Sequence, residues 1–476
     1  MKVRLVAAAA LAALAGPSFA LTPAQVAEAA TVKVYMSGAT ALRNVIGGLF
    51  TQNCEADLSV YFSSAGGTFG GINFPTAGDA HRVYACTMRS NSPVLPGRRV
   101  ALFKSDIGGS AQGVFPVYFG ALAPFPTRTF LALTNCSARV ATVPNYTCST
   151  EQNQVPMFGV SDNEPGLYTG FNVPKDDPSY PADGLSEAQL ADLDAAPLFQ
   201  TIFAVAVNKA LRDAMQAKQG LSVGSDAEAD RPSMSLAEAT SYFAGTLSDP
   251  AGGLGWQPIV LSTDPRAATR VNICRRVDGS GTQASANAFL LQFPCNQNAP
   301  APADASFSDD GLTQSANSAG PSGSVFVFEG STTGNVINCL NAAESNGAYA
   351  IGHVSKENNE FGTGSNWRHV KLDGVAPNRD NVKNGKYNYF YESTIQWHRT
   401  KFNTLSADQR TFVQQFRAFA QRPDALGNLS AANQLGVAAL PTSYPGAFGT
   451  GTPNEILFGS RVLRGGNSCQ LPQIVK

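Results

Sequence analysis

The chain has 476 residues, of which 14% are charged, and its formal net charge is −1. A nearly neutral chain with few charges lacks the attraction that nucleic acid or an anionic membrane requires of its main partner, so both are excluded in that role. The length allows two domains of ordinary size.

The first twenty residues have the pattern of a secretory signal peptide. Met1-Lys2-Val3-Arg4 is a short basic start, residues 5–15 are apolar, and Ser18 and Ala20 supply the small residues before a cleavage site. The apolar run is too short to span a bilayer, and no later stretch is long and apolar enough to do so. We therefore expect an exported protein, periplasmic or secreted, without membrane insertion.

All eight cysteines follow the expected cleavage site: Cys54, Cys86, Cys136, Cys148, Cys274, Cys295, Cys339 and Cys469. An even number in an exported protein predicts disulfides. Pairing of sequence neighbours would give 54–86, 136–148, 274–295 and 339–469, which is one of many connectivities. No Cys-x-x-Cys occurs and the four histidines are scattered, so we expect no zinc site and no other metal or cofactor.

Strand and helix patterns alternate along much of the chain, which predicts α/β layers. The run 202–207 is continuously apolar, as a strand buried on both faces requires. The expected strands are residues 32–36, 58–62, 100–104, 157–161, 202–207 and 269–274, with helices over 40–50 and 284–291.

Three capping boxes mark further helix starts, at Ser186-x-x-Gln189, Ser235-x-x-Glu238 and Ser406-x-x-Gln409. The last leads into Phe412, Val413, Phe416 and Phe419, an apolar stripe at helical spacing that predicts a core-facing helix. Loops of low complexity are expected at residues 66–78, 172–184 and 296–324.

The most informative segment is Arg276-Val277-Asp278-Gly279-Ser280-Gly281-Thr282. It stands between an expected strand and an expected helix. Free N–H groups and the positive end of the helix dipole make such a helix start an anion site. Arg276 can add a bidentate contact to a phosphate-like oxyanion. The alternative is an ordinary Asp-Gly-Ser-Gly turn.

Together with this segment, several islands resemble the type 2 periplasmic solute-binding proteins, specifically the phosphate-binding proteins of ABC importers. The islands occur in a consistent order between residues 32 and 392 and cover a minority of positions. They are Ser37-Gly38-Ala39-Thr40, Phe158-Gly159-Val160-Ser161-Asp162, residues 202–208, Phe243-Ala244-Gly245-Thr246 with Trp256, residues 276–282, 347–352 and 381–389.

The resemblance implies two α/β domains joined by two crossover strands, with a ligand cleft between the domains and disulfide-tied insertions. Domain I would comprise residues 31–203 and 388–476, and domain II residues 204–387. The chain is longer than usual members of the family and richer in cysteine. It also has Ala41 where an aromatic residue often follows the threonine.

The resemblance also implies a phosphate site. Its ligand-binding residues would be Thr40, Ala41, Ser110, Asp162, Arg276, Ser280, Gly281 and Thr282, with Asp278 supporting Arg276. For the family's Gly-Ser-Ser-Gly-Gly loop two stretches compete, residues 63–67 and 108–113. We prefer Ser110, because residues 108–113 follow an expected strand. Helix capping is the alternative role for Thr40 and Ser110, and a turn or cap for Asp162.

A carboxylate beside an anion makes sense if the ligand carries a proton. Asp162 can accept that proton's hydrogen bond, whereas fully ionised sulfate has none to give. The predicted function is therefore capture of inorganic phosphate, or a related oxyanion, without catalysis and for delivery to an ABC permease.

Two other classes of function stay open. An extracellular or cell-surface interaction protein could use the same fold, with its insertions and disulfides. A secreted phosphatase would need a nucleophile, but Ser280 lacks the Gly-x-Ser-x-Gly elbow.

Overall fold

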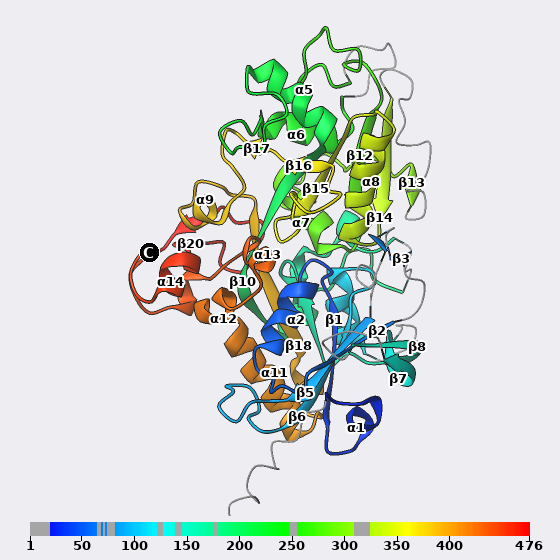
Figure 1. Ribbon diagram of the computed structural model, residues 1–476, viewed down its shortest axis with the longest axis vertical. Coiled ribbons are helices and arrows are strands. Elements are labelled where there is room, and N and C mark those ends of the chain that lie inside the picture. The colour runs from blue at the N-terminus through cyan, green and yellow to red at the C-terminus, as the bar shows by residue number, and fades with distance from the viewer. Residues whose placement is uncertain are drawn as a thin grey trace, which may run out of the picture.

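The computed structural model (Figure 1) describes most of the chain from residue 20 onward. The described residues are 20–63, 81–120, 127–138, 145–175, 179–247, 255–308 and 324–476, with the short strands β3 (Thr68–Phe69) and β4 (Ile72–Asn73). The expected signal peptide lies outside them except for Ala20. Parts of the expected loops 66–78, 172–184 and 296–324 lie outside them too.

The lower half of the molecule in Figure 1 is built on a parallel sheet around β1 (Val32–Gly38). This strand lies between β6 (Arg99–Ser105) and β9 (Phe158–Ser161), and both pair with it in parallel. Beyond β9 come β18 (Phe390–His398) and then β10 (Leu193–Asn208), each antiparallel to its predecessor. The strand order is therefore β6-β1-β9-β18-β10.

The upper half repeats this order with a second set of strands. At its centre β12 (Val271–Arg276) pairs in parallel with β14 (Val325–Gly330) and β15 (Ala350–Ser355). An antiparallel strand, β10, follows β15 and also pairs with β16 (Trp367–His369). In each half, the strand that follows the parallel set is antiparallel to it: β18 in the lower half and β10 in the upper half.

β10 belongs to both sheets. Residues 193–202 pair with β18, and residues 203–207 pair with β15. The strand changes partner between Ile202 and Phe203, and both side chains are fully buried. The expected doubly buried strand at 202–207 is therefore confirmed. So is the prediction of two α/β halves, between which the chain passes twice, once in β10 and once in the segment that leads into β18. The domain limits given above remain a prediction.

The lower half continues beyond β6 in a mostly antiparallel extension. β5 (His81–Thr87) is antiparallel to β6, and β2 (Ser59–Ser63) is antiparallel to β5. The hairpin of β7 (Arg128–Ala138) and β8 (Asn145–Gln154) closes this end, with β8 parallel to β2. The remaining short strands are β11 (Ser233–Met234), β13 (Phe307–Ser308), β17 (Lys371–Leu372), β19 (Val437–Ala438), β20 (Val462–Leu463) and β21 (Gln473–Ile474).

Three helices begin where the sequence carries a capping box. The capping boxes at Ser186, Ser235 and Ser406 all form. In the helix that follows Ser406, the stripe of Phe412, Val413, Phe416 and Phe419 is buried, as predicted. The helices of the lower half are α1 (Pro23–Ala27), α2 (Arg43–Thr51), α3 (Phe115–Phe119), α4 (Glu187–Ala191), α10 (Arg399–Phe402), α11 (Ala407–Ala420), α12 (Pro423–Gly427), α13 (Ala431–Gln434) and α14 (Pro453–Phe458).

Those of the upper half are α5 (Lys209–Gln219), α6 (Leu236–Phe243), α7 (Gly281–Leu290), α8 (Thr333–Ser345) and α9 (Arg379–Lys383). Short 3-10 turns occur at η1 (Ser110–Gly113), η2 (Pro165–Leu167), η3 (Gly170–Asn172) and η6 (Pro441–Ser443).

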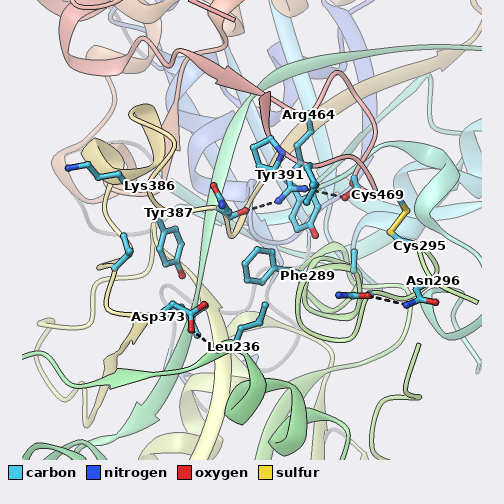
Figure 2. Close-up of a pocket in the computed structure, with 18 residues that line it drawn as sticks. Leu236, Phe289, Cys295, Asn296, Asp373, Lys386, Tyr387, Tyr391, Arg464 and Cys469 are labelled. Carbon is cyan, nitrogen blue, oxygen red and sulfur yellow. Dashed lines mark hydrogen bonds between the residues drawn. A yellow bond between two sulfur atoms is a disulfide. The ribbon is translucent and has the colours of Figure 1, made fainter. Parts of the chain in front are cut away.

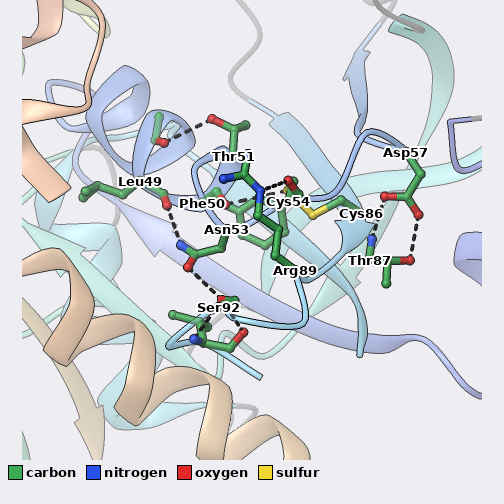
Figure 3. The surroundings of a disulfide bond; sticks show 12 residues. Leu49, Phe50, Thr51, Asn53, Cys54, Asp57, Cys86, Thr87, Arg89 and Ser92 are labelled. Atoms are coloured by element: carbon green, nitrogen blue, oxygen red, sulfur yellow. Dashed lines mark hydrogen bonds between the residues drawn. A yellow bond between two sulfur atoms is a disulfide. The ribbon is translucent and has the colours of Figure 1, made fainter. Parts of the chain in front are cut away.

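All eight cysteines are paired. The predicted bridges Cys54–Cys86 and Cys136–Cys148 are present, and the first ties the turn after α2 to β5 (Figure 3). The other two predicted pairs are wrong, because the bridges are Cys274–Cys339 and Cys295–Cys469. The first joins β12 to α8, which packs on that strand; the second joins the segment after α7 to the C-terminal segment. Spacing along the sequence carries no information about such packing.

Candidate functional site

The candidate site lies where strands of both halves end and helical turns begin. In the lower half, β1, β6 and β9 are parallel neighbours, so their carboxyl ends meet at one edge. In the upper half, β12 leads into α7 at the facing edge. The backbone N–H of Ala111 donates to the carbonyl oxygen of Gly279 at 2.9 Å, so the two edges are in direct contact.

Thr40 and Ala41 follow β1 and are buried. The Thr40 hydroxyl donates to the Asp106 carbonyl oxygen at 3.0 Å. Arg276 Nη2 of the upper half donates to the same hydroxyl oxygen at 3.4 Å. The helix after Thr40 starts later than expected, at Arg43, and its cap position is Leu42. Thr40 therefore contacts the other half and does not cap α2.

Ser110 follows β6 and two glycines, Gly108 and Gly109, each with a φ of 75°. Its hydroxyl oxygen accepts the backbone N–H of Asp162 at 3.1 Å. Ser110 thus lies beside Asp162, the predicted acceptor. It also follows a strand and a glycine loop and begins a helical turn, which is the local context for which we preferred it. In the competing stretch, Ser63 ends β2, and residues 64–67 lie outside the described part of the chain.

Asp162 follows β9 and is 1% exposed. Its Oδ2 accepts a hydrogen bond from the Thr282 hydroxyl at 3.4 Å, across the interface between the halves. Its Oδ1 is buried and has no hydrogen-bond partner. Burial raises the pKa of Asp162 to about 6, against the attraction of Arg276, which lowers it. A buried acceptor without a donor is costly unless a ligand supplies one.

The upper half supplies Arg276, Ser280, Gly281 and Thr282, all nearly inaccessible to solvent. Ser280 caps α7, its hydroxyl oxygen accepting the N–H of Gln283 at 3.4 Å. The Arg276 guanidinium donates to the carbonyl oxygens of Gly330 and Ser331 at 3.0 and 2.7 Å. Asp278, expected beside Arg276, forms an ion pair with Lys175 at 2.9 Å.

A buried charge cluster of Arg43, Lys104 and Asp106 adjoins Thr40, and the sequence analysis missed it. Arg43 Nε donates to Asp106 Oδ2 at 2.7 Å, and Lys104 Nζ donates to Asp106 Oδ1 and to the Gly38 carbonyl oxygen. Burial lowers the pKa of both Arg43 and Lys104, and Asp106 opposes the shift. The signal was available: a Lys-Ser-Asp run at the end of the strand before the Gly-Gly-Ser loop.

Five buried charged groups meet here. Arg43, Lys104 and Arg276 are cationic, and Asp106 and Asp162 are carboxylates, so the formal charges of these five groups sum to +1. The first turn of α7 lies beside them, and its N–H groups and dipole also favour an anion. The arrangement can hold a small oxyanion and offer an acceptor to a ligand hydroxyl.

Two further ionisable groups lie nearby, and burial shifts the pKa of each in the direction that favours the neutral form. His353 Nε2 lies 2.9 Å from Gln283 Oε1, and burial lowers the pKa of His353 to about 3. Burial raises the pKa of Glu357 to about 8. Among the described residues no group of three His, Cys, Asp or Glu side chains could hold a metal ion. No helix in that part of the chain is long and apolar enough to cross a membrane.

No family model and no curated protein matches the chain. The chain is similar to several solved structures. One is a protein from Clostridium perfringens, with bound phosphate, assigned as a phosphate ABC transporter substrate-binding protein (13% identity, TM-score 0.41, 85% of this chain and 99% of that chain).

Two more are an ABC-type phosphate transport receptor from Vibrio cholerae (10% identity, TM-score 0.39, 85% and 99%) and PstS from Borrelia burgdorferi (10% identity, TM-score 0.36, 85% and 98%).

Proposed function

We propose that this protein captures inorganic phosphate, or a closely related oxyanion, between its two halves, and that it does so in the periplasm or outside the cell for an ABC permease. The observation that carries the proposal is Asp162. Its buried Oδ1 lacks a donor, and it lies among Ser110, Thr282 and Arg276 from both halves.

Monoprotonated phosphate matches this environment in both charge and hydrogen bonding. Its ionised oxygens can accept from Arg276 and from the N–H groups that begin α7. Its P–OH group can donate to Asp162 Oδ1. Sulfate presents no hydrogen and would place its charge against the carboxylate, so the same site would disfavour it.

Binding without turnover is supported by the role of Ser280. Its hydroxyl accepts a backbone N–H as the cap of α7, which is a structural use of the group. A purified protein that hydrolyses a chromogenic phosphomonoester would contradict this part of the proposal.

The proposal is tested by calorimetric titration of phosphate into protein stripped of ligand. We expect micromolar or tighter binding by the wild type. Arg276→Ala removes a buried guanidinium and should weaken binding by about 2–5 kcal/mol. Arg270→Ala, which removes a half-buried arginine just before the same strand, should leave the isotherm unchanged. An absence of binding by the wild type, or an unchanged isotherm for Arg276→Ala, would reject the proposal.

A further inference from the structure

A second cavity, separate from the candidate anion site, lies beside the C-terminal segment of the chain. Figure 2 shows it between α7, the segment before β18, and the C-terminal segment. Its volume is about 450 Å³, within the range of small-molecule sites. Its walls come from both halves, and the bridge Cys295–Cys469 lies at one side of it.

The centre of the cavity is aromatic. Phe289, Tyr387 and Tyr391 line it, and Phe289 also stacks on the Tyr389 ring at a centroid distance of 4.5 Å. Leu236 and Leu372 add apolar wall. Phe289 is only partly buried, so part of its ring remains available to a ligand.

The charged groups of the cavity are already committed or lie at its edge. The Arg464 guanidinium donates to the carbonyl oxygens of Asn388, Phe390 and Gln470 at 2.7, 3.0 and 2.6 Å. Asp373 Oδ1 accepts the N–H of Leu236 at 3.0 Å. The Lys386 side chain points away from Phe289 (Figure 2).

Amides remain as polar partners for a ligand. Gln292 and Asn296 line one side, where Asn296 Nδ2 donates to Gln292 Oε1 at 3.2 Å, and both side chains are exposed. An aromatic centre with amides at the edge and no uncommitted buried charge suits an uncharged ring with a hydrogen-bonding edge.

We propose that this cavity is a second small-molecule site, for an uncharged aromatic ligand. It shares α7 with the anion site, because Gly281 and Thr282 begin that helix and Ala288 and Phe289 near its end line the cavity. The proposal rests on the cavity alone and holds whether or not the protein binds phosphate.

The test uses N-phenyl-1-naphthylamine, an uncharged aromatic fluorophore, titrated against the full protein. We expect saturable binding with one site per chain. Val375→Trp places an indole in the cavity and should weaken binding by about tenfold or more, since the site is then filled. Val223→Trp makes the same change at an exposed position outside the cavity and should have no effect.

A second pair of variants guards against misfolding of Val375→Trp. Leu471 lines the cavity and is 81% exposed, whereas Ile474 is exposed and outside it. Leu471→Asp should weaken probe binding and Ile474→Asp should not. The proposal is overturned if the wild type shows no saturable binding of the probe. It is also overturned if Leu471→Asp and Ile474→Asp, both folded, bind the probe equally well.

Discussion

Gly281 and Asp162 meet across the interface between the two halves so closely that a Cβ on Gly281 would lie 2.6 Å from Asp162 Oδ2 and 2.3 Å from the Ser110 hydroxyl oxygen. Only a residue without a side chain allows this approach. The contact therefore exists only while the two halves lie against each other in this arrangement.

Gly281→Ala should hold the halves apart. Alanine favours a helix over glycine by about 1 kcal/mol, but overpacking at this contact costs about 1–3 kcal/mol, so the clash decides the outcome. We expect a larger radius of gyration by small-angle scattering and weaker phosphate binding. Gly362→Ala is the control, because the nearest atoms to its added Cβ lie 3.4 Å away. Closure and affinity equal to those of the wild type would contradict the prediction.

Asp162→Asn should change ligand selectivity more than phosphate affinity. The amide still accepts a hydrogen bond from the ligand, but it no longer repels a fully ionised anion. We expect the preference for phosphate over sulfate to narrow by about tenfold or more. Competition titrations measure it. Asp278→Asn alters a buried carboxylate that pairs with Lys175 and should keep the ratio. An unaltered ratio in Asp162→Asn would make Asp162 a structural residue.

The same variant should reveal the pKa of Asp162 through stability. The folded pKa is raised to about 6, above the unfolded value, so wild-type protein binds an extra proton between the two values. The contribution of the Asp162 carboxyl to the free energy of unfolding is therefore present at low pH and is lost as the pH rises through about 6. Relative to wild type, Asp162→Asn should therefore gain about 1–3 kcal/mol between pH 4 and pH 8. Denaturant unfolding of ligand-free protein at several pH values measures it; a difference independent of pH would contradict the shift.

The bridge Cys295–Cys469 should stabilise the fold more than Cys136–Cys148. The first closes a loop of 174 residues and the second a loop of 12. In the chain-entropy description these correspond to about 5 and about 3 kcal/mol. Paired Cys→Ser variants of each bridge, compared by denaturant unfolding, give the two losses. Equal losses of unfolding free energy would contradict the chain-entropy description. Peptide mapping without reduction checks which cysteines are paired.

Local signals in the sequence predicted much of the fold. The strands that became β1, β6, β9 and β12 follow from apolar runs, which act over a few positions. The helix expected over 284–291 is also present, but it begins three residues earlier, at Gly281, with Ser280 as its cap. The partner of Cys274 was not predictable in this way, because it depends on α8 packing against β12. The charge cluster around Asp106 was missed for a related reason: Lys104 and Arg43 belong to different elements, which only the sheet brings together.

The residues of the candidate site also divide into those that local sequence could predict and those that depend on tertiary packing. Ser110 could be preferred over Ser63 from its local context alone. The contact of Arg276 with Thr40, and of Thr282 with Asp162, joins residues more than one hundred positions apart. Such contacts require the two halves to be placed against each other, which no short motif specifies.

Because β10 gives one end to each sheet, the two halves are not independent building blocks. A cut between Ile202 and Phe203 would leave residues 193–202 on one piece and their partner β18 on the other, so that each piece would carry an unpaired, mostly buried strand of the kind that promotes aggregation. The two pieces of such a cut are therefore poor targets for separate expression, whereas the same pieces produced together have complementary strands through which to reassemble.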